Sequence, residues 1–427
     1  MAHKRLQALK QGMQGSRKEL VDSLYLIALQ GINQFLPLLV LPYLMVVLGA
    51  TGYGYVGFSL SVIQYLVLVV DFGFNLSATR RVAQVRDDRR EVTRVFWSVF
   101  WAKLMLLAGT LLLLAVLLLA VPTFQKYQTA LLCTLPMLLG SAFTFLWLFQ
   151  GLGRVRQMAI INTASKIIML PLIFWLVKSP ADYPLAAFIQ SGVFVLTAVI
   201  SIGYLWRLRC VGAPVGERSA IRQAMSESFP LFLSSASTSV YTQLFVVILG
   251  FYCTTDVVGR YSSAERIMRA LCFVLYTPIN QAFFPRISAA AVAEPVQVRR
   301  IFSTLRNLVA AIMLLVGVAL FVGAPYVSYF LGSEYAGIED LLRIFAFAPI
   351  FIGMGGVYGQ SGLVAMGQHD AHRHFRNVYF MVAVLALALV AVLTPLFHET
   401  GAALALLASE MAVFVLMRLY ARRDLRL

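Results

Sequence analysis

The amino-acid sequence predicts an all-α, polytopic membrane protein with twelve transmembrane helices. Of its 427 residues, 60% are hydrophobic and 13% are charged, and the mean hydropathy is +0.80, whereas about a quarter of the residues in a soluble domain are charged. Uncharged runs recur along the whole chain, and about 20 apolar residues suffice to cross a bilayer as a helix. Because no segment alternates as a membrane strand does, helices are the expected spans.

The boundaries of the spans follow from the turn residues that divide these runs. Ser23–Val70 holds 48 residues without a charge and is expected to break at "LGATGYG", where Gly49, Gly52 and Gly54 favour a turn. Divided in this way, the chain gives the expected helices 20–48, 53–79, 94–120, 127–150, 157–178, 184–206, 226–252, 256–285, 302–324, 338–363, 375–396 and 399–419.

Basic residues predict the orientation. The termini and the loops on their side hold 26 Lys and Arg, and the opposite side holds two, Lys126 and Lys178. Positively charged loops stay in the cytoplasm, so we expect a protein of the bacterial inner membrane with both termini cytoplasmic. Topology and contact with anionic membrane lipid explain the net charge of +16, and no nucleic-acid partner is expected.

The spans divide into two halves of six. We expect a cytoplasmic arm (1–19), an N-lobe (20–206), a linker (207–225), a C-lobe (226–420) and a cytoplasmic tail (421–427). "VVLGATGYGYVGFS" in the first half resembles "VILGFYCTTDVVGRYSS" in the second, and Gly151 aligns with Gly367. Such parallel repeats predict a substrate site at the repeat interface, near the membrane midplane.

Seven basic residues are predicted at membrane depth, where an ionised side chain costs roughly 2.5–3.5 kcal/mol and marks a pathway or a pair. Arg260 and Arg343 lie near the outer ends of their spans and Arg306 near an inner end, so snorkelling explains them. The seven are Lys103, Lys166, Arg260, Arg266, Arg269, Arg306 and Arg343.

Arg266 and Arg269 lie roughly 15–20 Å along their span, near the bilayer centre. A spacing of three residues places them on one helical face, and Glu265 is expected to point elsewhere. Two interpretations stay open: a structural pair with an acid on another helix, or a cationic wall of a water-filled cavity. In a cavity, guanidinium groups would suit a phosphate-bearing ligand.

Four further charges need partners or water at similar depth. Lys166 lies about 13 Å from the inner end of its span, and Lys103 lies at a similar depth. Asp71, about 12 Å from the inner end of its own span, shares the level of Lys103, so the two form either an internal salt bridge or a gate or proton site. Glu410, about 12 Å above Arg418, suits either proton exchange or a pair with a C-lobe arginine.

Amide side chains form a stripe in the first span. Gln30, Asn33 and Gln34 share one side of the helix with Pro37. Such a stripe serves either as helix-packing contacts or as hydrogen-bond partners for sugar hydroxyls.

The segments "LPLLVLPYLMVVLGATGYGYVGFS", "DFGFNLSATRRVA", "WLFQGLGRVRQMAIIN" and "GAALALLASEMAV" closely resemble the O-antigen flippases of the Wzx type, in the multidrug/oligosaccharidyl-lipid/polysaccharide exporter (MOP) superfamily. The resemblance implies two six-helix bundles around a central V-shaped cavity and a rocker-switch cycle driven by an ion gradient. It implies undecaprenyl-pyrophosphate carrying an oligosaccharide as the substrate, with a polysaccharide polymerase and a chain-length regulator as candidate partners. A cationic cavity in this family agrees with Arg266, Arg269, Lys166 and Lys103.

Three other functions were weighed against this one. A drug/cation antiporter of the same superfamily would favour an acidic site, and a lipid II flippase usually carries additional spans. A polyprenyl-glycan processing enzyme typically has a large extracytoplasmic loop, whereas here the longest is about a dozen residues around "LGSEYAGIED". No phosphate-binding glycine loop and no metal-ligand spacing among the four cysteines are present in the sequence, so neither enzymatic activity nor a cofactor or metal is expected.

Overall fold

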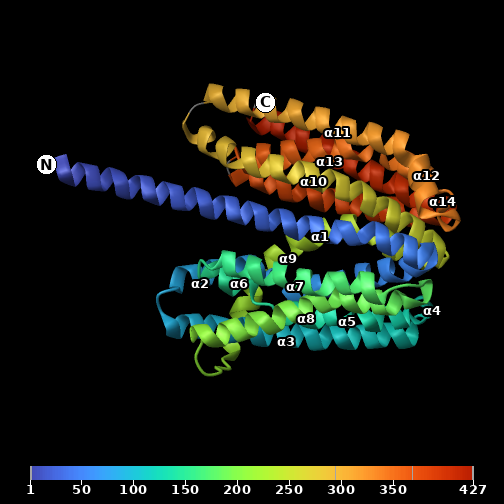
Figure 1. The fold of residues 1–427 in the computed structure, drawn as a ribbon, viewed down its shortest axis with the longest axis horizontal. Coiled ribbons are helices and arrows are strands. Elements are labelled where there is room, and N and C mark those ends of the chain that lie inside the picture. Colours follow the sequence, from blue (N-terminus) through green and yellow to red (C-terminus); the bar gives the residue numbers. More distant parts are fainter. Residues whose placement is uncertain (1, 294, 368, 426–427) are drawn as a thin grey trace.

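The computed structural model describes the backbone of residues 2–293, 295–367 and 369–425, and these residues form helices and turns without a strand. Side chains are described for the same residues except 2–30, 32, 34, 237, 238, 240–242, 292, 293, 295, 296 and 369. Two helical bundles lie side by side (Figure 1). The predicted all-α membrane fold is confirmed.

The first bundle, the N-lobe, is formed by the first half of the chain. Its elements are α1 (Ala2–Asp71), α2 (Phe74–Val85), α3 (Arg89–Ala120), α4 (Pro122–Lys126), α5 (Gln128–Phe143), α6 (Leu146–Gly151), α7 (Val155–Leu176), η1 (Pro180–Asp182) and α8 (Tyr183–Leu208).

The second bundle, the C-lobe, is formed by the second half. Its elements are α9 (Arg218–Tyr252), α10 (Thr255–Ala293), α11 (Pro295–Leu331), η2 (Ser333–Tyr335), α12 (Ile338–Phe345), α13 (Ala348–Gly356), the π-helix η3 (Val357–Val364) and α14 (His369–Leu425).

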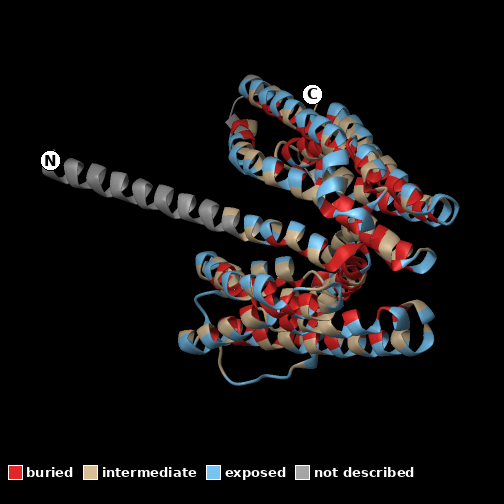
Figure 2. Cartoon of the chain, turned by 45° about the vertical axis from the view of Figure 1, so that its right-hand side comes forward, coloured by how far each residue is buried: buried red, intermediate tan, exposed pale blue. Residues whose placement is uncertain are grey.

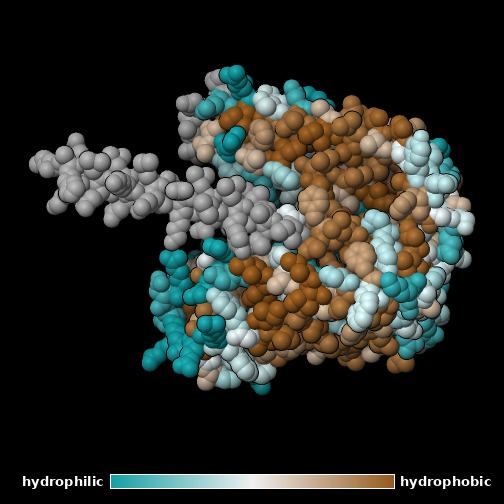
Figure 3. Space-filling view, viewed as in Figure 1, coloured by the Kyte–Doolittle hydropathy of each residue, from teal (hydrophilic) through white to brown (hydrophobic). Residues whose placement is uncertain are grey.

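Within the described residues, nine helices are long and apolar enough to cross a membrane. Two of them, α1 and α14, contain two crossings each, because the backbone leaves helical geometry at Gly49 (φ 65°) and at His398 (φ 51°). With the apolar segment Gln243–Tyr252 of α9, the arrangement is consistent with twelve crossings. Figure 3 shows apolar side chains over the middle of both bundles and hydrophilic ones gathered toward the two ends.

The two ends of the molecule differ in their turns. We call the end with the loops 86–88, 152–154 and 209–217 the basic end, and the end with the kinks at Gly49 and His398 the far end. The expected break in "LGATGYG" occurs at Gly49 alone, and the helix already contains Gly52 and Gly54. The prediction that all three glycines break the helix is therefore wrong for the last two.

Two predicted spans are interrupted near the basic end. The predicted span 53–79 breaks at Phe72 and Gly73, which have φ values of 42° and 78°. A Cβ on Gly73 would lie 2.8 Å from the backbone of Ser228 and Phe232 in α9, and the Phe72 ring stacks on Phe232 with 4.8 Å between centroids. Contact with α9 therefore fixes this turn. The predicted span 127–150 breaks in the same way, between α5 and α6.

The helix α9 packs on both bundles. Near the basic end, Ala224 belongs to a buried cluster with Phe74 and Trp147 of the N-lobe, and the Ser228 hydroxyl lies 2.6 Å from that of Ser77. Nearer the far end, Leu249 of α9 belongs to the large core that includes the C-lobe helices, and α14 is the main neighbour of α9. The first turns of α9 thus lie against the N-lobe.

The linker before α9 is attached to α3. Arg94 makes two hydrogen bonds to the Glu217 carboxylate, at 2.9 and 2.8 Å, and the Trp97 indole donates to the Gly212 carbonyl at 3.1 Å. These hydrogen bonds from the Arg94 guanidinium lower the pKa of the Glu217 carboxyl.

The two lobes meet at the far end with their backbones in contact. A Cβ on Gly54 would lie 2.0 Å from the Thr255 carbonyl oxygen, and one on Gly259 would lie 1.8 Å from the Ala50 carbonyl oxygen. Only glycine permits such an approach. Figure 2 shows buried residues concentrated where the bundles join. The glycine-rich segments that suggested an internal repeat therefore pack against each other.

A side-chain clasp from the C-lobe covers the kink at Gly49. The Glu334 carboxylate accepts a hydrogen bond from the Ala50 N–H at 3.1 Å, and the buried Tyr335 hydroxyl donates to the Met45 carbonyl at 3.1 Å. A helix end leaves such backbone groups without partners, and a carboxylate is favourable at a helix N-terminus. Glu334 and Tyr335 thus cap both sides of a break in the other lobe.

The orientation of the molecule can be tested with single cysteines. In a variant without the four native cysteines, Cys at Arg89 should react only with a reagent that enters the cytoplasm, because the basic loops are expected there. Cys at the exposed far-end residue Ser333 should react with an impermeant reagent added outside intact cells. Outside labelling at position 89 would contradict the topology.

Candidate substrate cavity

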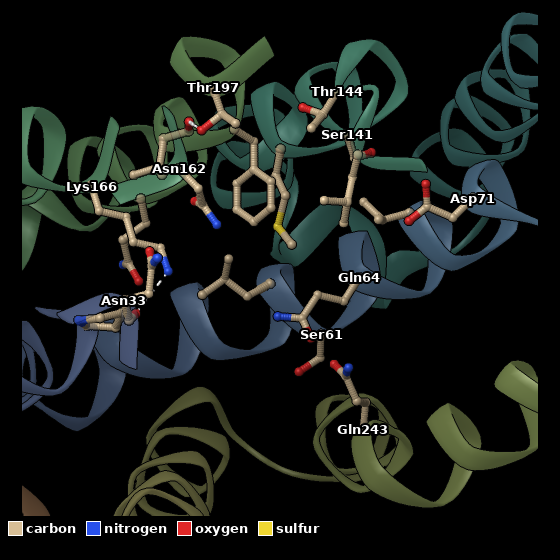
Figure 4. Close-up of a pocket in the computed structure, with 18 of the residues that line it drawn as sticks. Asn33, Ser61, Gln64, Asp71, Ser141, Thr144, Asn162, Lys166, Thr197 and Gln243 are labelled. Atoms are coloured by element: carbon tan, nitrogen blue, oxygen red, sulfur yellow. Dashed lines mark hydrogen bonds between the residues drawn. The ribbon is translucent and has the colours of Figure 1, made fainter. Parts of the chain in front are cut away.

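A cavity of about 1020 Å³ lies between the lobes. The helices α1, α5, α7 and α8 supply its N-lobe wall, and α9 and α10 supply its C-lobe wall. It extends from Gly57, close to the far-end contact, to Asp71 and Asn75 near the basic end. Gly57 and Asp71 are about 21 Å apart along α1 at the helical rise. Figure 4 shows polar side chains along this path.

Lys166 lies on the cavity wall because of a proline in another helix. Pro37 has no N–H, so the carbonyl of Asn33, four residues earlier in α1, lacks its helical donor. The Lys166 ammonium donates to this carbonyl at 3.0 Å. The Asn33 amide donates to the Thr163 hydroxyl at 2.7 Å, which ties α1 to α7. Among the described side chains, no carboxylate pairs with Lys166.

Arg266 is the corresponding cation of the C-lobe wall. Its guanidinium lies 5.7 Å from the centroid of the Tyr53 ring, a cation–π distance. No described carboxylate forms an ion pair with Arg266, and the residue lines the cavity. Lys166 and Arg266 together form what we call the cationic pair, one residue from each lobe.

Arg269, one turn further along α10, belongs to a buried ionic cluster. Its guanidinium lies 2.8 Å from the Glu265 carboxylate and 3.7 Å from that of Glu410 in α14. The expectation that Glu265 points elsewhere is therefore wrong, because residues four apart share a helical face. Of the two interpretations of Arg269, the structure shows the pair with an acid on another helix. It also supplies Glu410 with a C-lobe arginine.

Asp71 and Lys103 lie together at the basic end of the cavity. The Lys103 ammonium is 2.9 Å from the Asp71 carboxylate and donates to the Ser141 carbonyl at 3.2 Å. Ser141 lies near the C-terminus of α5, where a cation is favourable. The Lys103 side chain is 2% exposed, whereas Asp71 is 27% exposed and lines the cavity. Lys103 thus stands behind Asp71.

The remaining sequence candidates divide into two groups. The side chains of Gln30 and Gln34 lie outside the described residues. Arg260 is held near the far end by Asp256 at 3.0 Å and by Glu399 at 3.1 Å, so it is paired and does not need snorkelling. Arg306 and Arg343 make only local contacts, with Asn307 and Asp340.

Three cavity amides were not found from the sequence. Gln64 in α1, Asn162 in α7 and Gln243 in α9 all line the cavity. Each stands alone in an apolar run, so no local pattern separates it from an amide that packs helices together. Asn162 precedes Lys166 by four residues, and this helical spacing was the one available signal.

Comparison with known proteins places this cavity in a family. Residues 20–291 match the model of a family described as polysaccharide biosynthesis protein. The chain belongs to this family. A "Putative O-antigen transporter" of Escherichia coli (strain K12) is 31% identical over 94% of this chain and 96% of its own. A protein of the same name from Shigella dysenteriae is 29% identical over 92% and 98%. The resemblance to O-antigen flippases is confirmed.

Solved structures show the same fold for this polysaccharide biosynthesis protein. An inward-facing multidrug-resistance transporter of the MATE family, in the MOP superfamily, has a TM-score of 0.70 at 16% identity over 94% of this chain and 98% of its own. The lipid II flippase MurJ, in an inward closed conformation, also has a TM-score of 0.70, at 13% identity over 92% and 86%. At these identities the likeness establishes the transporter fold.

Proposed function

We propose that the protein is a flippase that moves undecaprenyl-pyrophosphate-linked oligosaccharide repeat units from the cytoplasmic to the periplasmic leaflet. The observation that carries the proposal is the cationic pair, Lys166 and Arg266, in a cavity between two lobes. A diphosphate leaving water needs charged partners, and this pair has no carboxylate to neutralise it among the described side chains. The other buried cations on or beside the cavity, Lys103 and Arg269, already hold carboxylates.

The membrane geometry supports the same proposal. The lobes are in backbone contact at the far end, whereas the cavity continues to Asp71 and Asn75 near the basic end. With the basic end in the cytoplasm, this is a loading state that receives substrate from the cytoplasmic side. Rocking of the lobes would then expose the cavity on the other side. No covalent step is required, so the protein acts without enzymatic chemistry.

An ion gradient is the proposed source of direction. Asp71 with Lys103, and Glu410 with Arg269, are buried acid–base pairs that a proton could open by neutralising the carboxylate. A drug/cation antiporter would use a cavity acid for its cargo, but Glu265 is held by Arg269 and Asp71 by Lys103. The cationic pair thus favours an anionic cargo.

Arg266→Ala and Lys166→Ala should each abolish surface glycan in a strain that lacks its own flippase. Removal of one of two cations takes away a charge-assisted contact to the pyrophosphate, and such contacts are worth about 1.5–3 kcal/mol each. Surface glycan is measured together with the amount of protein in the membrane and of lipid-linked repeat units, which should accumulate. Arg266→Lys should rescue poorly if a two-point contact matters.

The exposed Arg306→Ala is the matched control and should display normal glycan. Normal display by Arg266→Ala and Lys166→Ala, at normal protein levels, would exclude the pyrophosphate site.

A further inference from the structure

The polar groups of the cavity separate into two kinds. One kind is ionic: the cationic pair and the two neutralised clusters around Lys103 and Arg269. The other kind is uncharged and includes the amides Gln64, Asn162 and Gln243. The amides occupy a stretch between the cationic pair and Asp71, and Figure 4 shows Asn162 beside Lys166 and Gln64 toward Asp71.

These three amides are not packing contacts between helices. The Asn33 amide ties α1 to α7, and the Asn280 amide bonds Gln360 at 2.9 Å. By contrast, no hydrogen bond joins Gln64, Asn162 or Gln243 to another described residue. Their donors and acceptors therefore remain available to the cavity, and three helices from both lobes contribute one each.

We infer that Gln64, Asn162 and Gln243 form a glycan subsite that reads the sugars next to the pyrophosphate. This inference is built on the proposed function and assigns the part of the cavity that holds the carbohydrate. A side-chain amide offers two donors and an acceptor, which matches the mixed donor and acceptor character of sugar hydroxyl and acetamido groups. The cavity volume lies at the upper end of the roughly 300–1,000 Å³ of typical ligand sites, so several sugar units fit.

Helix geometry sets the order of the two subsites. Asn162 lies one turn from Lys166 toward the basic end, about 6 Å along α7. Gln64 precedes Asp71 by about 10 Å along α1, on the side of the cavity facing Gln243 (Figure 4). With the pyrophosphate at the cationic pair, the first sugar meets Asn162 and the following ones lie between Gln64 and Gln243, toward the basic end.

The subsite would also explain how such a protein selects its repeat unit. A site that hydrogen-bonds a hydroxyl discriminates strongly against a ligand lacking it, because the buried amide is then left without a partner. The cationic pair contacts a group common to all such lipids and carries no information about the sugars.

The test measures the affinity of the purified protein for two probes. One is undecaprenyl pyrophosphate, and the other is the lipid-linked repeat unit extracted from cells of the parent bacterium in which this gene is deleted. Gln64→Leu, Asn162→Leu and Gln243→Leu should each weaken binding of the glycosylated probe about two- to tenfold, the value of one hydrogen bond. Binding of undecaprenyl pyrophosphate should stay unchanged. Gln297→Leu, at an exposed residue of α11, is the matched control.

Lys166→Met and Arg266→Met should weaken the binding of both probes. If the wild-type protein binds both probes and the three amide variants bind the glycosylated one like the wild type, the glycan subsite is overturned while the proposed function stands. If the wild-type protein binds neither probe, the proposed function fails and the subsite with it. Thermal unfolding of each variant confirms that the protein is folded.

Discussion

Asp71→Asn is expected to lower the free energy of unfolding by about 3–5 kcal/mol, the usual cost of removing one partner of a buried ion pair. The cost arises because the Lys103 ammonium, 2% exposed, keeps its charge and loses the carboxylate 2.9 Å away. The Ser141 carbonyl compensates it only in part. A second substitution, Lys103→Met, removes the stranded charge and should restore most of the stability.

Protein abundance and surface glycan of Asp71→Asn and of the double variant separate two roles of the pair. Rescue of both quantities by Lys103→Met would show that the pair is structural. A double variant that is abundant but displays no glycan would contradict this and make Asp71 a coupling residue, since no titratable carboxylate remains at that position. Asp87→Asn, at an exposed loop residue, serves as the control.

Gly259→Ala is expected to prevent closure of the far end and to abolish glycan display. The added Cβ would lie 1.8 Å from the Ala50 carbonyl oxygen, and the neighbouring atoms are backbone, so no side chain can move away. Overpacking of this kind costs typically 1–3 kcal/mol. A penalty of about 2 kcal/mol on this state alone moves the equilibrium between states by roughly thirtyfold.

Labelling of a cysteine at Ser262 measures this shift. Ser262 is 1% exposed and lies at the far-end limit of the cavity, so an impermeant reagent added outside should label it in Gly259→Ala but not in the parent. Gly323→Ala is the matched control, since a Cβ there has nothing within 4 Å. Unchanged labelling and normal display in Gly259→Ala would show that the glycine contact does not define the closed state.

The features that the sequence could predict are those that follow from one helix at a time. Hydropathy and turn glycines located the crossings, and the helical rise placed Asp71 and Lys103 at one level. The spacing of Glu265 and Arg269 was equally legible, and the error there came from considering only the neighbour in sequence. Depth and helical face therefore suffice for charged residues, because few partners are available at any level.

The features that the sequence could not predict depend on two helices that are distant along the chain. The turn at Phe72 and Gly73 is fixed by Phe232 of α9, and Lys166 finds its carbonyl through Pro37 in another helix. The amides Gln64 and Gln243 gain meaning only because they face one cavity. An isolated amide in an apolar run has the same local sequence whether it lines a cavity or packs a helix.

The double attachment of α9 has a mechanical consequence. Its first turns are held by Ser77 and Phe72 of the N-lobe, whereas Leu249 lies in the core shared with the C-lobe. When one lobe rotates relative to the other, the two ends of this single rod are carried in different directions, so the rod has to flex in every cycle. Elastic energy loaded into it during one half of the cycle is returned in the other. The stiffness of α9 would then help set the turnover rate, independently of how tightly the cavity holds its cargo.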